Sequence, residues 1–135
     1  MPRQILDEAH IHPAIRDRIA NHQQWILDEV MSAIEGNDVV VVGMGMNPWP
    51  AKARQALDTA GQPYKYLEYG NYLTFWRERN ALKMWTGWPT FPMVFVKGTL
   101  VGGYTDLRAL MQSGELKNML GAQSRSKKPR RKAAE

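Results

Sequence analysis

The stretch VVVVGMGMNP, residues 39–48, decides the fold of this chain because one element ends within it and the next begins. The four consecutive valines from Val39 to Val42 do not alternate with polar residues, which is typical of a strand buried on both faces. Asn47 is a favoured helix N-cap residue, and Pro48 is a favoured first helical residue. The stretch therefore predicts a buried strand, a loop, and a helix that runs to about Ala60.

The segment before the valines predicts one long helix from Pro13 to Glu35. Its apolar residues recur near helical spacing. Proline suits the first position of a helix, and Gly36 suits the residue just after its end. This helix lies outside the strand–helix unit that begins at residue 39, so it is an addition at the N-terminal side.

The segment after Ala60 alternates turn signals with short apolar runs, which predicts further short elements. Lys97-Gly98 is the kind of tight turn that joins two strands of a hairpin. In chain order we expect a strand over residues 64–69, a helix from Asn71 to about Met84, strands over 93–96 and 99–101, and a last helix from Tyr104 or Thr105 that pauses at Ser113-Gly114 and resumes through Leu120.

The resulting order, α-β-α-β-α-β-β-α, predicts the α/β class. Two strands joined by a crossover helix lie parallel, with a right-handed connection, whereas the strands of a hairpin are antiparallel. A mixed four-stranded sheet flanked by helices on both faces follows from this order. We therefore expect a thioredoxin-like fold with an extra N-terminal helix.

The composition describes one globular domain without thiol chemistry. A length of 135 residues is enough for one sizeable core. The absence of cysteine excludes disulfides, thiolate metal sites and a cysteine nucleophile. No apolar run approaches the roughly 18 residues of a membrane-spanning helix, and residues 1–12 lack the apolar centre of a signal peptide. We expect a cytoplasmic protein without a membrane partner, and the sequence leaves the oligomeric state open.

The net charge of +5 is concentrated at the C-terminal side. Residues 124–135 carry six cations and one acid, so the rest of the chain is electrically balanced. A basic segment with few apolar residues does not bury surface, which predicts a disordered basic tail over residues 122–135. The cations from Arg125 to Lys132 predict contacts with the phosphates of a nucleic acid, although a solvated terminus is the plainer interpretation.

Three motifs, in this order and at these separations, resemble the glutaredoxin family. VVVVGMGMNPWPAKARQAL, residues 39–57, is similar to the family's first strand and active-site helix. WPTFP, residues 88–92, is similar to its Trp-Pro-Thr-hydrophobic-Pro loop, whose last proline is cis, and VGGYTDL, residues 101–107, to its Val-Gly-Gly-x-x-Asp-Leu turn. The resemblance covers about residues 37–121, which leaves residues 1–36 as an N-terminal extension and 122–135 as the tail.

The chain departs from the family where the family does its chemistry. The resemblance places Asn47 and Pro50 at the two cysteine positions. A cysteine at a helix N-terminus is a stabilised thiolate, and thiol–disulfide exchange requires that thiolate to attack sulfur. An amide does neither, so we expect no oxidoreductase activity by the family's mechanism and no catalytic residue. A redox role would rest on the family label alone.

The resemblance implies that a glutathione groove survives. It implies that the backbone of Phe91 pairs with the ligand, that Thr105 and Asp106 receive its γ-glutamyl carboxylate, and that Arg79 clamps its glycyl carboxylate. Met44 stands where the family has a lysine, so one cationic contact is missing and we expect weak binding. The plainer interpretation of Asn47 is a helix cap, and that of Arg79 a solvated helix residue. The predicted ligand site consists of Met44, Asn47, Trp49, Arg79, Thr90, Phe91, Pro92, Gly102, Gly103, Thr105 and Asp106.

These observations predict a binding or regulatory module that takes glutathione or an extended peptide, with no required cofactor. Glu8, His10 and His12 do not form a convincing metal site, so we expect no metal. The alternative is a nucleic-acid-associated scaffold anchored by the tail. An enzyme using non-thiol chemistry is disfavoured because the sequence has no recognisable acid–base pair and no glycine loop for phosphates.

Overall fold

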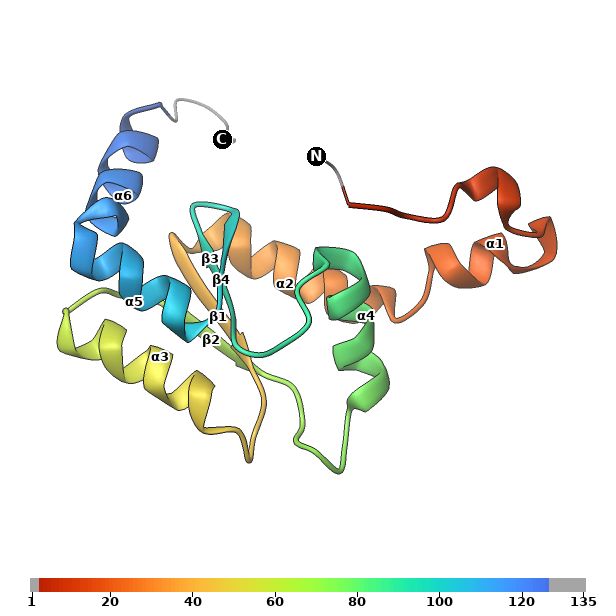
Figure 1. Ribbon diagram of the computed structural model, residues 1–135, viewed down its shortest axis with the longest axis horizontal. Helices are drawn as coiled ribbons and strands as arrows, with labels where there is room; N and C mark the ends of the chain where they lie inside the picture. Colours follow the sequence, from red (N-terminus) through yellow and green to blue (C-terminus); the bar gives the residue numbers. More distant parts are fainter. Residues whose placement is uncertain (1–2, 127–135) are drawn as a thin grey trace.

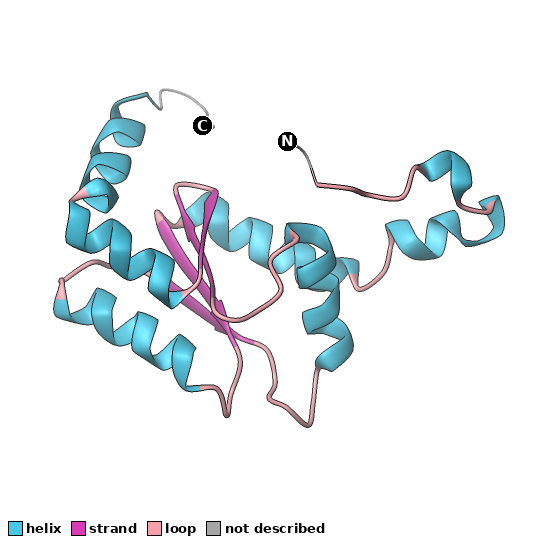
Figure 2. Cartoon of the chain, in the orientation of Figure 1, coloured by secondary structure: helices cyan, strands magenta, loops and turns pink. Residues whose placement is uncertain are grey.

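The structure, a computed structural model, describes residues 3–126, with side chains described for residues 3–121. A sheet lies between two layers of helices (Figure 1; Figure 2). The elements are the 3-10 helix η1 (Glu8–His10), α1 (Pro13–Ala20), α2 (Gln24–Gly36), β1 (Val39–Gly43), α3 (Pro48–Thr59), β2 (Lys65–Glu68), α4 (Trp76–Thr86), β3 (Met93–Val96), β4 (Thr99–Gly102), α5 (Tyr104–Ser113) and α6 (Glu115–Ser126).

The four strands form one mixed sheet in the order β2-β1-β3-β4. β1 pairs with β2 in parallel, with Val41 opposite Tyr66, and with β3 in the antiparallel sense, with Val41 opposite Val94. β3 and β4 form the antiparallel hairpin. The thioredoxin-like fold with a mixed four-stranded sheet is confirmed, and the valine run is its central strand.

Each face of the sheet carries its own core, because successive strand residues point to opposite faces. Val40 and Val42 belong to the cluster that α2 and α4 cover. Val39 and Val41 belong to the cluster that α3, α5 and α6 cover. Figure 1 shows the same division, with α2 and α4 on one side of the sheet and α3, α5 and α6 on the other. All four valines are buried, as a strand covered on both faces requires.

The prediction of one helix from Pro13 to Glu35 is wrong, because the helix is interrupted. α1 ends at Ala20, and Gln23, at φ 50°, turns the chain before α2 begins at Gln24. The two helices differ in what they contact. α2 buries Ile26 in the core, whereas α1 has no buried residue and lies away from the sheet (Figure 1). The helical spacing continued through both, but only the second half has a sheet to pack against.

The predicted helix start at Asn71 is also wrong. Asn71 Oδ1 accepts a hydrogen bond from the Leu73 N–H at 2.8 Å, so its side chain closes a turn rather than capping a helix. Phe75, at φ 60°, precedes α4, which begins at Trp76. Local side-chain-to-backbone bonding by asparagine serves turns and caps equally well, and the sequence does not distinguish them.

The last helix divides at Gly114, whose φ of 84° suits a glycine, as the predicted pause indicated. α6 extends to Ser126, beyond the predicted end at Leu120, so the first residues of the predicted disordered tail are helical. The rest of that tail, residues 127–135, lies outside the described residues, and the nucleic-acid contact stays a prediction. Within residues 3–126, no helix has the length and apolar character needed to cross a membrane.

Candidate functional site

Asn47 connects the start of α3 to the loop before β3. Its Oδ1 accepts a hydrogen bond from the Trp49 N–H at 3.0 Å, which makes it the N-cap of α3. Its Nδ2 donates to the Phe91 carbonyl at 3.3 Å, across 44 residues of sequence. The Phe91–Pro92 peptide bond is cis. Through this hydrogen bond, the side-chain amide of Asn47 lies directly beside the cis-proline turn. The start of α3 and the loop before β3, two of the sequence motifs, therefore lie side by side.

A cavity of about 260 Å³ opens beside this contact, and we call it the cis-proline crevice. Residues from α3, the loop before β3 and the start of α5 form its walls. Seven of the predicted site residues are among them. The lining consists of Trp49, Trp88, Thr90, Phe91, Pro92, Gly103, Tyr104, Thr105 and Asp106.

The N-terminus of α5 presents three backbone donors to the crevice. The N–H groups of Tyr104, Thr105 and Asp106 have no hydrogen-bond partner among residues 3–126, and all three residues line the cavity. The Asp106 carboxylate turns back and accepts the Gly103 N–H at 3.1 Å. Unpaired N–H groups and the positive end of a helix dipole together favour an anion. The crevice therefore has the chemistry to hold a carboxylate at this end.

Gly102 shapes that helix end without lining the crevice. Its φ is +115°, and a Cβ atom built there would lie 2.5 Å from the Asp106 Oδ2 atom. Only glycine combines this backbone conformation with so close an approach. Gly102 was predicted to be a direct part of the ligand site. In the structure it instead allows Asp106 to approach the backbone closely.

Phe91 offers its backbone at the other end of the crevice. Its side chain is buried in the core, so only the peptide groups of its loop are available. Its carbonyl accepts from Asn47, and among the described residues its N–H has no partner. An unpaired N–H next to a carbonyl with a remaining lone pair is able to add an extended segment by strand-like pairing.

Two aromatic residues that the sequence analysis did not assign to the site also form its walls. Trp88 Nε1 is buried and has no hydrogen-bond partner in the described part of the chain. The Tyr104 ring lies 5.9 Å from the Trp49 ring, and Lys52 Nζ lies 4.9 Å from the Trp49 ring centroid. Tyr104 directly follows the glycine pair Gly102-Gly103 at the junction of β4 and α5, and this position was the signal that could have identified it.

Met44 and Arg79, both predicted to belong to the ligand site, do not line the crevice. Met44 is 5% exposed and belongs to the core cluster beneath α2 and α4. Arg79 is 6% exposed, and its Nη1 atom donates to the Tyr69 carbonyl at 3.1 Å and to the Thr74 carbonyl. Burial lowers the pKa of Arg79. The crevice lining contains no lysine or arginine, since the expected clamp is engaged in holding the 69–74 turn.

No group of three or more His, Cys, Asp or Glu side chains gathers within residues 3–121 in an arrangement able to hold a metal ion. Glu8, His10 and His12, considered from the sequence, are exposed residues of the N-terminal arm. Nothing in this part of the molecule thus adds a metal centre to the crevice.

Comparison with known proteins identifies the family. The Glutaredoxin family model matches residues 39–101. A "Glutaredoxin-like protein" of Dictyostelium discoideum is 44% identical over 106 residues, which span 78% of this chain and 86% of that protein. "Probable monothiol glutaredoxin 2" of Rickettsia conorii is 35% identical over 101 residues, spanning 71% and 92% of the two chains. The chain belongs to the glutaredoxin family.

Solved structures agree with the fold. Oxidized glutaredoxin 2 from Chlamydomonas reinhardtii is 28% identical, with a TM-score of 0.63 over 76% of this chain and 96% of that one. The buckwheat glutaredoxin–glutathione complex is 22% identical and has a TM-score of 0.63 over 76% of this chain and 93% of that one, so it shares the fold. Within this family, the present chain is a glutaredoxin-like domain with no cysteine anywhere in its sequence.

Proposed function

We propose that this glutaredoxin-like domain binds glutathione, or an extended peptide with a similar carboxylate, in the cis-proline crevice and performs no thiol–disulfide exchange. The observation that carries the proposal is the placement of unpaired backbone donors. Phe91 and residues 104–106, whose N–H groups have no partner among the described residues, all line one cavity. A peptide backbone fits the first donor and a carboxylate fits the others.

The crevice has groups that can bind a ligand but no thiolate that could react with one. Asn47 holds the position from which a thiolate would attack, but its amide is neutral and its two polar atoms are engaged with Trp49 and Phe91. Exchange between thiols and disulfides requires a thiolate nucleophile, and the chain supplies none. The protein named in the buckwheat complex holds glutathione on the same fold, which supports the choice of ligand.

The affinity is expected to be low. The crevice lining lacks a cation, so a second carboxylate on the ligand finds no charge-assisted partner there. A ligand that pairs with the Phe91 carbonyl must either share it with the Asn47 amide or displace that amide. A dissociation constant on the order of 1 mM is the expected scale, which corresponds to about 4 kcal/mol of binding free energy.

An amide-shift titration with reduced glutathione tests the proposal. We expect shifts at Phe91, Thr105 and Asp106 at millimolar ligand. S-methylglutathione should produce the same shifts because no free thiol is needed. Cysteinylglycine, which lacks the γ-glutamyl carboxylate, should leave Thr105 and Asp106 unchanged. If none of the three resonances moves with glutathione, the glutathione proposal fails.

A turnover assay tests the absence of thiol chemistry separately. We expect reduction of a mixed disulfide by glutathione to proceed at the rate of the protein-free blank. A rate above the blank would contradict the proposal, because no residue of this chain could then account for the sulfur chemistry.

A further inference from the structure

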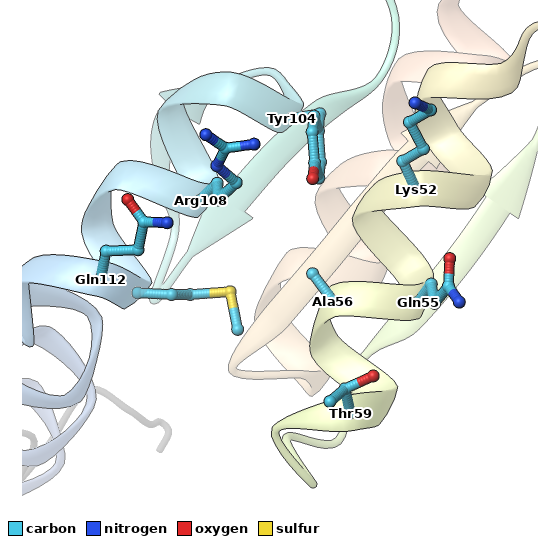
Figure 3. A pocket seen from close by; sticks show the side chains of 8 residues that line it. Lys52, Gln55, Ala56, Thr59, Tyr104, Arg108 and Gln112 are labelled. Carbon is cyan, nitrogen blue, oxygen red and sulfur yellow. The ribbon is translucent and has the colours of Figure 1, made fainter.

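A second and larger cavity lies between α3 and α5, and we call it the α3–α5 groove. Its volume is about 550 Å³, within the range of roughly 300–1,000 Å³ that is usual for binding sites. It shares only Tyr104 with the cis-proline crevice. Figure 3 shows the two helices as its walls, and the lining consists of Lys52, Gln55, Ala56, Thr59, Tyr104, Arg108, Met111 and Gln112.

The charged side chains that line the groove, Lys52 and Arg108, are both positive. Lys52 and Arg108 are each the fifth residue of their helix, and they project from opposite walls (Figure 3). Within the described residues neither is part of an ion pair, and the lining contains no acid. The acids on these helices interact elsewhere: Asp58 with Arg54, and Asp106 with the Gly103 N–H. No carboxylate among the described residues therefore neutralises either cation, although Lys52 Nζ also lies over the Trp49 ring.

The floor of the groove is apolar. Ala56 of α3 and Met111 of α5 are half-buried side chains that both line the groove. Ala56 is small, so space remains above it, and Met111 is a flexible side chain that adapts to different apolar partners. Gln55 and Gln112 add amide groups to the lining. An apolar floor with a basic rim matches a segment that alternates acidic and apolar side chains.

The charge also decides between possible occupants. Two copies of this chain meeting through the groove by two-fold symmetry would place like charges opposite each other, which is unfavourable. The chain's own C-terminal segment is rich in lysine and arginine and is excluded on the same ground. We propose that the α3–α5 groove binds an acidic amphipathic segment of a partner protein, with its carboxylates on Lys52 and Arg108 and an apolar side chain over Ala56 and Met111. This proposal does not depend on glutathione binding in the crevice.

Fluorescence anisotropy with a defined probe tests the proposal. The probe is a fluorescein-labelled peptide of about 12 residues built from Glu, Leu and Ala, long enough for three helical turns. We expect saturable binding to the full chain and a loss of affinity of about tenfold or more in the double variant Lys52→Glu, Arg108→Glu. The variant Ala56→Trp, which fills the groove without changing its charge, should weaken binding to a similar extent.

A matched control separates the groove from general charge attraction. The double variant Lys65→Glu, Lys117→Glu changes the net charge by the same amount at two exposed sites outside the groove. It should bind the peptide within about threefold of the wild type, since exposed charges away from the contact are screened. Circular dichroism melting of each variant identifies any that fail to fold, and Ala56→Trp and Lys52→Glu, Arg108→Glu test the groove independently.

Three outcomes would overturn the proposal. The first is equal loss in the groove variant and the control variant. The second is unchanged binding in both Ala56→Trp and the groove variant. The third is equal affinity of the groove for a probe of different chemistry. That probe is either the peptide with Lys in place of Glu or a single-stranded oligouridylate.

Discussion

At the residue scale, the contacts of Asn47 matter most, because the resemblance to the family places this residue at the first of the two cysteine positions. Asn47 caps α3 through its oxygen and contacts the Phe91 carbonyl through its nitrogen. An asparagine cap contributes about 1 kcal/mol to stability, so the position retains a structural role. The same helix end that accepts this neutral cap would stabilise an anion.

Replacing Asn47 by cysteine should install an activated thiol. The N-terminus of α3 is expected to lower the pKa of that thiol below its usual value of about 8.5. The measurement is the pH dependence of alkylation by iodoacetamide, together with formation of a mixed disulfide with oxidised glutathione. The control is Thr59→Cys, at the last residue of α3, where the helix dipole has the opposite sign. Equal thiol pKa values at the two positions would contradict the prediction.

Replacing Gly102 by alanine should destabilise the fold. The new Cβ atom would lie 2.5 Å from the Asp106 Oδ2 atom in a backbone conformation with φ +115°. Both effects act in the same direction, and we expect a loss of more than about 1 kcal/mol in the free energy of unfolding. Urea denaturation measures it.

The control for Gly102 is Gly36→Ala, at the end of α2. No atom lies within 4 Å of a Cβ built at Gly36, and its backbone is helical. Alanine there should be neutral or stabilising by up to about 1 kcal/mol. Similar losses at Gly36 and Gly102 would show that the close approach to Asp106 is not the cause.

At the element scale, the sequence predicted the strands and the crossover helix well. The valine run predicts a buried strand and Asn47-Pro48 predicts a helix start, both from neighbouring residues alone. The tertiary structure places a buried strand and a helix N-terminus at these positions. The helix predicted over residues 13–35 failed because spacing along the chain does not reveal where the sheet ends. Arg79 lies outside the crevice because it donates to the Thr74 carbonyl, in a segment predicted to be helical, and to the Tyr69 carbonyl at the end of the predicted strand over 64–69.

The end of β2 should make stability fall in alkaline solution. Burial, followed by hydrogen bonds to Glu68 and Glu29, raises the pKa of Tyr66 and Tyr69 above the usual value of about 10. The unfolded chain therefore loses these protons first, so the stability present below about pH 10 declines as the pH rises further. Urea midpoints measured between about pH 8 and pH 11 should show this decline.

The double variant Tyr66→Phe, Tyr69→Phe should flatten that decline, because no phenol is left to titrate at these two sites. Tyr72→Phe is the control, since Tyr72 is exposed and its removal should leave the slope unchanged. If the alkaline slope of the double variant equals that of the wild type, the decline has another origin.

At the scale of the whole molecule, the N-terminal arm (residues 3–22) contributes less burial than the body of the protein, which begins at α2. η1 and α1 contain no buried residue, and Arg3 touches the body through a 3.2 Å hydrogen bond to the Met84 carbonyl. α2, by contrast, buries Ile26 and Val30 completely. The core that determines stability therefore begins at α2, inside the segment that the sequence analysis set apart as an extension.

Deleting residues 1–22 should leave the body folded. Because residues 3–22 contain no buried side chain, the free energy of unfolding is expected to change by less than about 1 kcal/mol. Ile26→Ala in the full chain is the comparison, and it should cost about 2–5 kcal/mol because Ile26 is fully buried. Thermal and urea denaturation measure both. A truncated chain as unstable as the Ile26 variant would show that the arm contributes packing.

The bridge made by Asn47 has a consequence for how occupancy of the cis-proline crevice can be read. A bound backbone that takes over the Phe91 carbonyl releases the nitrogen of the amide, and the freed side chain then restrains the first turn of α3 less firmly. A ligand in the crevice should therefore accelerate deuterium uptake at the Trp49 N–H. Local opening of the first turn of α3 would then indicate that the crevice is occupied.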